Sequence, residues 1–312
     1  MSRLQVLLAS LCFGTTGTAQ ALGPAGLSPA GVGAARILVG GTLLVLVALV
    51  GSGLGDRTRQ PASPAPCAIA ERSLRGSLGG LPRRPLILAA LAVAAYQLAF
   101  FAAVADTGVA IGTIVALGSA PALAGALEWT IERRAPTRAW ALATALACAG
   151  VAMLALTGAD ASISAGGIVL ALIAGASYAG YTYSAKQMLH AGHSPETVMA
   201  GAFGLGAVVL LPQLFITGAS WLATTDGLLL AVFLGIVPTA GAYLLFARGL
   251  KRLSAAETAT LTLAEPLTAT LLGVIVLSET LNAPAAVGAA LILSGLLVLA
   301  APEVRRPVTV PA

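Results

Sequence analysis

The chain has 312 residues, of which 58% are hydrophobic and only 9% are charged, and its mean hydropathy is +0.93. An ordinary soluble domain of this length carries far more charge, so the composition excludes a soluble protein and places the chain in a lipid bilayer. The formal net charge of +5 comes from Lys and Arg in short breaks between apolar stretches, which indicates membrane topology and offers no continuous basic face for nucleic acid.

Ten apolar stretches of roughly 20 residues, each long enough to cross about 30 Å of hydrocarbon, follow one another along the chain. In chain order they cover residues 4–23, 31–53, 86–105, 110–131, 138–157, 166–187, 196–217, 227–247, 257–278 and 284–301. Residues 55–85 are crowded with Pro, Ser, Gly and Arg, and we expect a flexible cytoplasmic loop there. The sequence therefore predicts an all-α membrane protein with ten transmembrane helices.

The N-terminal stretch has a second interpretation. Arg3, a short apolar run and the segment Ala19–Ala21 together imitate a cleavable signal peptide. Cleavage would leave nine helices and would remove the partner of the sixth helix in the internal repeat described below. The repeat therefore favours retention of this stretch as the first helix.

The distribution of Lys and Arg predicts the orientation. If the N-terminus is cytoplasmic, every Lys and Arg except Arg36 falls in a segment on the inner side. The outer loops then hold as charges only Asp106, Asp160, Asp226 and Glu279. Because Lys and Arg remain on the cytoplasmic side, we expect both termini in the cytoplasm and a chain that crosses the membrane many times.

An internal repeat is visible in the sequence. Residues 101–121 align without gaps on residues 246–266, and both copies continue through a charged break into a helix of small residues. Asp106 of the first copy falls opposite Lys251 of the second, so the basic end has changed sides. Copies with exchanged basic ends lie upside down relative to one another in the membrane. The repeat predicts inverted topology, an architecture typical of secondary transporters.

The repeat divides the chain into two five-helix halves, residues 1–160 and residues 161–312. No G-x-x-x-x-G-K-[ST] phosphate loop occurs in either half, which excludes direct use of ATP by that motif. The two histidines, His190 and His193, lack the spaced partners of a metal site. We expect no catalytic residues, no metal and no cofactor.

Small residues four apart mark two helices that pack closely against neighbours. The two sets are Gly112, Ala116 and Ala120 in the fourth helix and Ala171, Gly175 and Ala179 in the sixth. We expect both helices inside the bundle.

Glu265 is the clearest charged residue within a predicted span. If the ninth helix begins near Glu257, Glu265 lies roughly 12 Å from the cytoplasmic face, too deep for its side chain to reach water. Pro266 follows it, and we expect a kink there and an unsatisfied carbonyl at Thr262, as well as a kink at Pro121 in the first copy. Glu265 either binds a cationic substrate group or carries a proton, or it is a protonated structural residue bonded to another helix.

Two further charged residues have simpler explanations. Arg36 lies about 7 Å deep from the outer face, where it either reaches the head groups or caps a neighbouring helix, or contacts substrate. Direct pairing of Arg36 with Glu265 is not expected, because they lie on opposite sides of the midplane. Glu128 lies near the cytoplasmic end of the fourth helix. Its expected partners are the nearby arginines, Arg133, Arg134 and Arg138.

Aromatic, amide and hydroxyl side chains at depth complete the candidate pocket, because they offer an organic ligand stacking surfaces and hydrogen bonds. They are Tyr96, Gln97, Tyr178, Tyr181, Tyr243, Thr16 and Gln20. For each of them, packing between helices is the alternative role.

With these features in place, the chain resembles the drug/metabolite transporter superfamily, and more narrowly a ten-helix permease with two EamA-type repeats. The resemblance is closest over residues 243–299, which include LAEPL at 263–267 and SETL at 278–281. The first repeat is looser, with Ala120 where the family pattern expects the counterpart of Glu265.

The resemblance implies an inner-membrane permease, often an exporter of amino acids, metabolites or drugs, with a central cavity between its halves. Its expected partners are the bilayer, a small-molecule substrate and protons or another coupling ion, and its expected state is a monomer or a homodimer. Two alternatives belong to other classes: a membrane scaffold that transports nothing, and an intramembrane enzyme. An enzyme would need a paired acid or a metal site, and the sequence offers no second carboxylate as deep as Glu265 on a facing helix.

Overall fold

The computed structural model describes residues 1–56, 79–133, 135–156, 164–278 and 282–301. Within these residues every regular element is helical and no strand is present, which confirms the predicted all-α class. In chain order the elements are α1 (Ser2–Leu22), α2 (Pro29–Asp56), α4 (Arg83–Glu132), α5 (Arg138–Leu156), α6 (Ala165–His190), α7 (Pro195–Ile216), the 3-10 turn η1 (Ser220–Ala223), α8 (Thr225–Gly235), the π-helical η2 (Ile236–Gly241), α9 (Ala242–Leu250), α10 (Ala255–Leu261), α11 (Ala264–Val276) and α12 (Ala283–Ala300).

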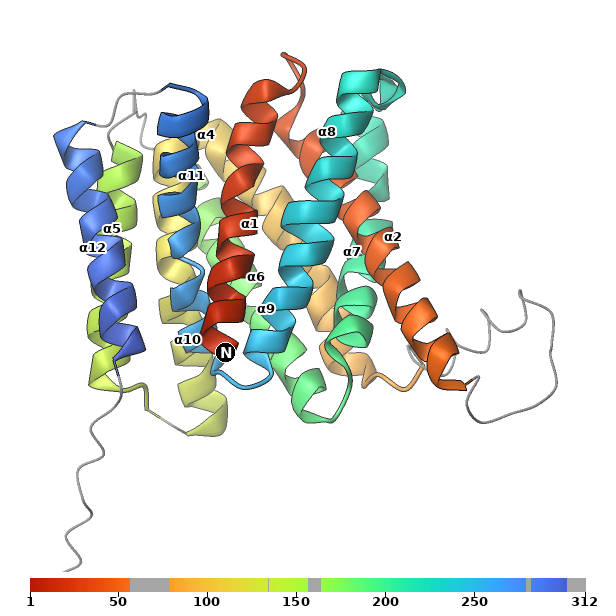
Figure 1. Ribbon diagram of the computed structural model, residues 1–312, viewed down its shortest axis with the longest axis horizontal. Helices are drawn as coiled ribbons and strands as arrows, with labels where there is room; N and C mark the ends of the chain where they lie inside the picture. The colour runs from red at the N-terminus through yellow and green to blue at the C-terminus, as the bar shows by residue number, and fades with distance from the viewer. Residues whose placement is uncertain (57–78, 134, 157–163, 279–281, 302–312) are drawn as a thin grey trace, which may run out of the picture.

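The long helix α4 contains the third and fourth predicted spans, which meet at Gly108. This glycine has φ 81° and ψ 160°, a left-handed conformation that a residue without Cβ adopts readily. The chain rises to this point and then descends (Figure 1). After the reversal Gly112 packs against Val104, where an added Cβ would lie 3.0 Å from a Val104 methyl group.

Two other predicted spans are interrupted in mid-course. The π-helical η2 joins α8 to α9 around Pro238, and within it the Thr239 hydroxyl donates to the Leu234 carbonyl at 2.7 Å. Proline cannot donate a backbone hydrogen bond, so a widened turn relieves the clash in an otherwise continuous helix. The ninth predicted span divides into α10 and α11, with Thr262 and Leu263 between them.

Eight stretches of the described helices are long and apolar enough to cross a membrane by length and composition. The first predicted span, in α1, is not among them. The fifth is present as a shorter apolar helix, Arg138–Leu154. The prediction of ten spans is therefore met in part, and the inverted repeat stays a prediction.

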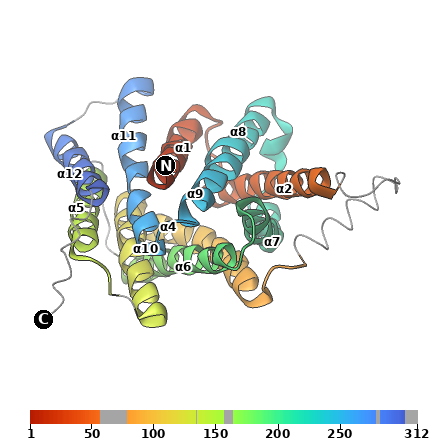
Figure 2. The same ribbon diagram turned by 60° about the horizontal axis from the view of Figure 1, so that its bottom comes forward.

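The helices stand side by side in one bundle (Figure 1). α5 and α12 form a pair at one edge, and α2 and α7 lie toward the other, while α1, α9 and α10 lie between these edges in both views (Figures 1 and 2). We call the end where α1 finishes and α2 begins the upper end, and the end where α1 and α10 begin the lower end. In the predicted topology the lower end is cytoplasmic.

Small residues bring neighbouring helices together, as predicted. A Cβ on Gly175 of α6 would lie 2.9 Å from the Ala116 carbonyl of α4, and Ala116 and Ala171 share one buried cluster. The α5–α12 pair is equally close, because a Cβ on Gly150 would lie 2.5 Å from the Gly288 carbonyl. These contacts leave no room for a side chain at either position.

The predicted loop 55–85 is shorter than expected at both ends. α2 continues to Asp56, and α4 begins at Arg83 directly after Pro82. Residues 57–78 lie outside the described residues, as do the predicted outer-loop acids Asp160 and Glu279.

Candidate functional site

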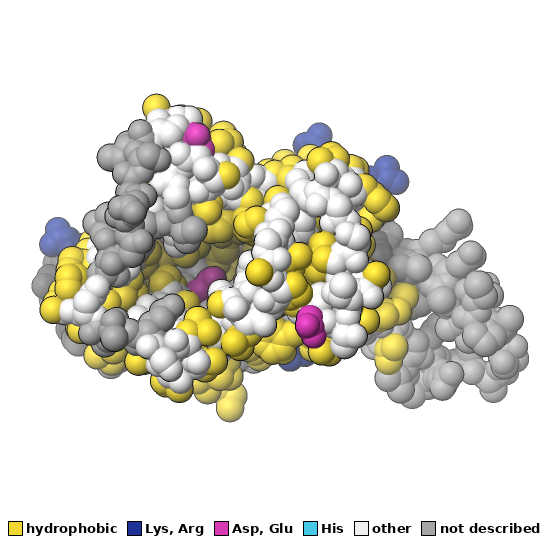
Figure 3. Space-filling model, turned by 90° about the horizontal axis from the view of Figure 1, so that it is seen from above, with side chains coloured by type: hydrophobic (Ala, Val, Ile, Leu, Met, Phe, Trp, Pro, Cys, Tyr) yellow, Lys and Arg dark blue, Asp and Glu magenta, His cyan; other side chains and the backbone are white. Residues whose placement is uncertain are grey.

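A cavity of about 620 Å³ lies among α1, α2, α4, α5 and α11. Seen from the upper end, the surface is hollowed near its middle, and an acidic side chain is visible inside the hollow (Figure 3). Glu265 is the acidic residue among the described residues that line the cavity, and Arg36 is the basic one. We call this space the central cavity.

The central cavity brings together six of the nine candidate binding residues, from positions far apart in the sequence. They are Thr16 and Gln20 of α1, Arg36 of α2, Tyr96 and Gln97 of α4, and Glu265 of α11. Its wall thus combines a cation, a carboxylate, amides and hydroxyls within apolar surroundings.

Glu265 lies in the first turn of α11, directly after the interruption that separates α11 from α10. Pro266 fits this position because the first backbone N–H groups of a helix have no partner within it. The N-terminus of a helix carries partial positive charge, which stabilises a carboxylate placed there. One expectation is wrong: the Thr262 carbonyl is not left free, because it accepts the Glu265 N–H at 2.9 Å.

Arg36 faces the same space from α2. Its Nε atom is buried and has no hydrogen-bond partner among the described residues. The pair Arg36–Glu265 is absent from the ion pairs formed by these residues, in line with the prediction that the two do not bond directly. A buried donor without an acceptor is costly, so Arg36 is a residue of this wall whose hydrogen bonding the described protein leaves incomplete.

Two uncharged polar groups have different environments. The Thr16 hydroxyl is buried and, within the described structure, also lacks a hydrogen-bond partner. The Gln97 amide instead donates to the Gly33 carbonyl at 3.1 Å, which ties α4 to α2 beside Arg36. Gln97 therefore has a packing role, whereas the hydrogen bonding of the Thr16 hydroxyl is left incomplete by the described residues.

Three predicted tyrosines do not line the central cavity. Tyr178, Tyr181 and Tyr243 border a separate narrow space of about 10 Å³, together with Tyr96 and Gln97. Tyr243 packs against Phe203 with 4.1 Å between ring centroids and the rings tilted by 44°, and the Tyr178 hydroxyl bonds the Thr262 hydroxyl at 3.0 Å. These tyrosines form a packed aromatic cluster and do not belong to the wall of the central cavity.

The cavity also has aromatic walls that sequence reasoning missed. Phe13, Phe100 and Phe101 line it. Helix spacing was the signal that could have found two of them, because Phe100 and Phe101 each lie four residues after Tyr96 and Gln97, on the same helix faces. Apolar residues in a lipid-spanning helix give no other indication of which ones face a ligand.

Two of the predicted partners of Glu128 are wrong, because neither Arg133 nor Arg138 pairs with it among the described residues, and the third, Arg134, lies outside those residues. Its carboxylate bonds the Lys186 ammonium at 3.3 Å and accepts the backbone N–H groups of Ala255 at 2.6 Å and Ala256 at 3.2 Å. The side chain thus points across the bundle to α6 and α10. Arg133 adopts a left-handed conformation at the end of α4, with φ 57°, where the regular helix terminates.

The helix also continues through Pro121, and the non-helical backbone in α4 is at Gly108, so a kink at Pro121 stays a prediction. Among the described residues no group of three or more His, Cys, Asp or Glu side chains is placed to hold a metal ion.

The sequence matches the EamA-like transporter family over residues 2–156 and 165–301. Over 298 residues it is 39% identical to a protein of Bacillus subtilis (strain 168) named uncharacterized transporter YwfM, a match that covers 96% of this chain and 93% of the relative. A second relative, an uncharacterized transporter of Archaeoglobus fulgidus, is 35% identical over 134 residues, which are 42% of this chain and 47% of that protein.

A crystal structure described only as that of a protein superimposes with a TM-score of 0.73 over 95% of each chain, at 21% sequence identity, and so shows the fold alone. The family match extends over nearly all of both predicted halves, and the first relative covers nearly the whole chain. The chain belongs to the EamA-like transporter family of membrane proteins.

Proposed function

We propose that this membrane transporter is a secondary transporter that exports small organic molecules across the bacterial inner membrane by alternating access. The observation that carries the proposal is the central cavity, open at the upper end and walled by Arg36 and Glu265. Its volume of about 620 Å³ lies in the range of sites that bind metabolites, amino acids or drug-sized molecules.

The walls support a substrate with both an acidic and a basic group. The Arg36 guanidinium is the cationic group of the cavity wall and would bind a carboxylate or another anionic group. Glu265 accepts from an ammonium group, and Phe13, Phe100 and Phe101 offer apolar and aromatic surface to the body of the molecule. A dipolar organic molecule with an apolar portion satisfies all of these groups together.

The energy source in this proposal is an ion gradient or the substrate's own gradient, because the sequence has no phosphate-binding loop for ATP. Two five-helix halves of inverted topology, residues 1–160 and 161–312, would rock about the central cavity. With the N-terminus cytoplasmic, the upper end faces outward and the structure corresponds to the outward-open state.

The deciding experiment uses purified protein in liposomes loaded with a panel of labelled amino acids, metabolites and cationic drugs. We expect saturable efflux of at least one class that accelerates when a proton or ion gradient is imposed. Downhill exchange should persist after the gradients are dissipated. Strict dependence on ATP, or no transport of any class by verified folded protein, would refute the proposal.

The same experiment separates the two other classes of function. A scaffold would move none of the panel, and an intramembrane enzyme would return chemically altered compounds, which mass spectrometry of the recovered panel would detect. Glu265 is the sole carboxylate among the described residues that line the central cavity, which disfavours two-acid catalysis there.

A further inference from the structure

A second cavity, of about 450 Å³, lies at the lower end of the bundle. Its wall is richer in charged side chains than that of the central cavity and includes Arg3 of α1, Glu128 of α4, Lys186 of α6 and Glu257 of α10. Of the described residues that line this lower pocket or the central cavity, none lines both. The two spaces are therefore separated by packed protein.

Helix α10 contributes to that separation. Ala256 and Glu257 in its first turn border the lower pocket, whereas Glu265, just beyond its far end, borders the central cavity. Between them Thr260 and Leu261 are 0% and 1% exposed. Thr262 and Leu263 keep right-handed backbone angles, but the regular helix is interrupted at these residues, so α10 and α11 are two segments and not one continuous helix.

Glu128 holds the first turn of α10 from another helix. Its carboxylate accepts the Ala255 and Ala256 N–H groups, which have no partner within the helix, and pairs with Lys186. Lys186 in turn donates to the Leu253 carbonyl at 2.8 Å, just before α10. Glu128 and Lys186 are both buried, so the contact is shielded from water.

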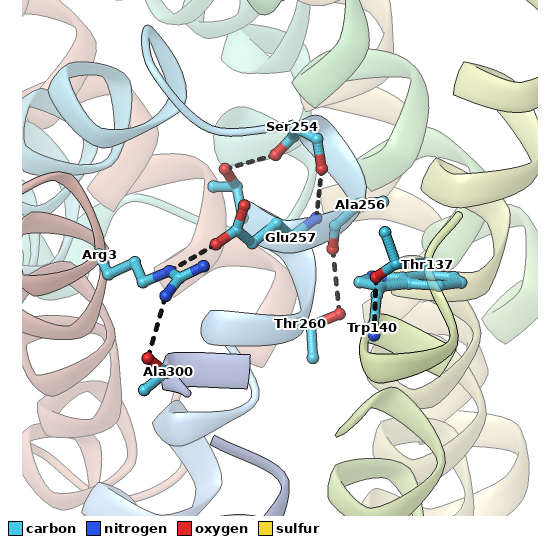
Figure 4. Close-up of polar contacts among 9 residues, drawn as sticks. Arg3, Thr137, Trp140, Ser254, Ala256, Glu257, Thr260 and Ala300 are labelled. Carbon is cyan, nitrogen blue, oxygen red and sulfur yellow. Dashed lines mark hydrogen bonds and ion pairs between the residues drawn. The ribbon is translucent and has the colours of Figure 1, made fainter. Parts of the chain in front are cut away.

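A second contact fastens the same turn to α1 and α12. Arg3 bonds Glu257 at 2.6 Å and the Ala300 carbonyl at 3.2 Å, and the Ser254 hydroxyl accepts the Glu257 N–H at 2.9 Å (Figure 4). The Arg3–Glu257 pair is partly exposed and therefore weaker than the Glu128 contact.

We infer that α10 is the gate between the central cavity and the lower pocket, and that Glu128 is the latch that holds it closed. Movement of α10 away from Glu128 joins the two spaces and opens the lower end. The inference rests on the proposed function, since passage between the two spaces is needed only by a transporter. In the predicted halves Glu128 belongs to the first and α10 to the second, so the latch spans the boundary that alternating access must rearrange.

The test measures access to α10 without requiring transport. In protein whose Cys12, Cys67 and Cys148 are replaced by Ser, a single cysteine is introduced by Thr260→Cys, a buried position next to Thr144. The rate of labelling by a polar maleimide is then measured in nanodiscs. Removing one partner of a buried charged contact strongly favours the open form, so Glu128→Gln should accelerate labelling at least about tenfold.

Two control variants make the result specific. Glu132→Gln removes an exposed carboxylate one turn further along α4 and should leave the rate unchanged. Glu196→Gln breaks the exposed pair with Arg248 at the lower end, away from α10, and should also leave it unchanged. A wild-type rate in Glu128→Gln, or an equal acceleration in Glu132→Gln, would overturn the inference.

If Glu128→Gln does not fold, the labelling rate of Glu257→Gln tests whether α10 is the gate. This substitution breaks only the partly exposed pair with Arg3 and should accelerate labelling roughly two- to fivefold. No acceleration there overturns the gate. Because labelling is independent of substrate, a negative transport assay refutes the proposed function, whereas unchanged labelling refutes the gate.

Discussion

Replacement of Glu265 by Gln tests the central cavity most directly. Glutamine preserves the shape of the side chain and its place in the first turn of α11, but it cannot hold a charge. A hydrogen bond between a charged group and its partner contributes about 1.5–3 kcal/mol, so loss of a contact with a substrate cation should weaken apparent affinity roughly 10- to 100-fold. If Glu265 carries protons instead, the variant should lose the pH dependence of transport.

The assay is substrate efflux from liposomes at several pH values, with expression and size-exclusion elution as checks on folding. Glu132→Gln is the matched control, because Glu132 is an exposed carboxylate at the end of α4 that lies outside the central cavity. Loss of expression in Glu265→Gln would favour the structural alternative. Wild-type transport with an unaltered pH profile would refute a functional role for Glu265.

Three other predictions follow from the same structure. Arg36→Gln should weaken inhibition of transport by carboxylate-bearing compounds roughly tenfold or more, and it should not affect inhibition by compounds without an anionic group. Competition assays measure both effects, and an equal loss for both classes of compound would contradict a role of Arg36 in binding an anionic group. Gly175→Ala should lower the free energy of unfolding by about 1–3 kcal/mol, because the added Cβ meets the backbone of α4. Gly180→Ala on the same helix, where an added Cβ has no atom within 4 Å, should leave that free energy unchanged or raise it, and thermal unfolding of both variants measures the difference. Reporter fusions after Arg75 should indicate cytoplasm and fusions after Asp226 the outer side, and a cytoplasmic signal at Asp226 would contradict the predicted orientation.

The sequence was most informative where the bilayer restricts the choice of residue. Helices could be predicted because a segment in lipid must form all of its backbone hydrogen bonds internally. Arg36, Thr16 and Glu265 could be identified because a polar side chain in such a segment is costly unless it has a partner or a function. The direction of a side chain was harder to predict. Tyr178 and Tyr243 are predicted pocket residues, and they border the narrow space of about 10 Å³ and not the central cavity. Which space a side chain borders depends on how its helix is rotated about its axis, and the sequence does not give that rotation.

The partners of Glu128 could not be predicted from the sequence either. Its sequence neighbours include three arginines, which made a local ion pair the simplest expectation. Its actual partners are 58 residues away at Lys186 and 127 residues away at Ala255. Such pairing depends on which residues of α4 and α6 face each other and on the start of α10 at Ala255, which leaves its first N–H groups without partners in the helix. The spacing of small residues indicates close packing but does not identify these partners.

The interruption between α10 and α11 divides one predicted span into two parts with different proposed roles, gating and substrate binding. Glu265, after the interruption, borders the central cavity, which is the proposed substrate site, while the first turn of α10, before it, is held by Glu128, the proposed latch. A transporter must populate the less stable form of its gate, here the open form. A population of 0.1–10% corresponds to a free-energy difference of about 1.4–4 kcal/mol between the open and closed forms, so the Glu128 contact must favour the closed form by no more than this range allows. A ligand shifts the balance between the closed and open states of the gate only by binding one state better than the other. Glu265 lies close to the interruption, so its distance from a bound ligand can differ between the two states. The two carboxylates should therefore give separable phenotypes: Glu128→Gln changes how often the gate opens and leaves substrate affinity in the outward-open state intact, whereas Glu265→Gln changes that affinity and leaves the unliganded labelling rate at position 260 intact. If both substitutions changed both quantities equally, binding and gating would reside in one inseparable site.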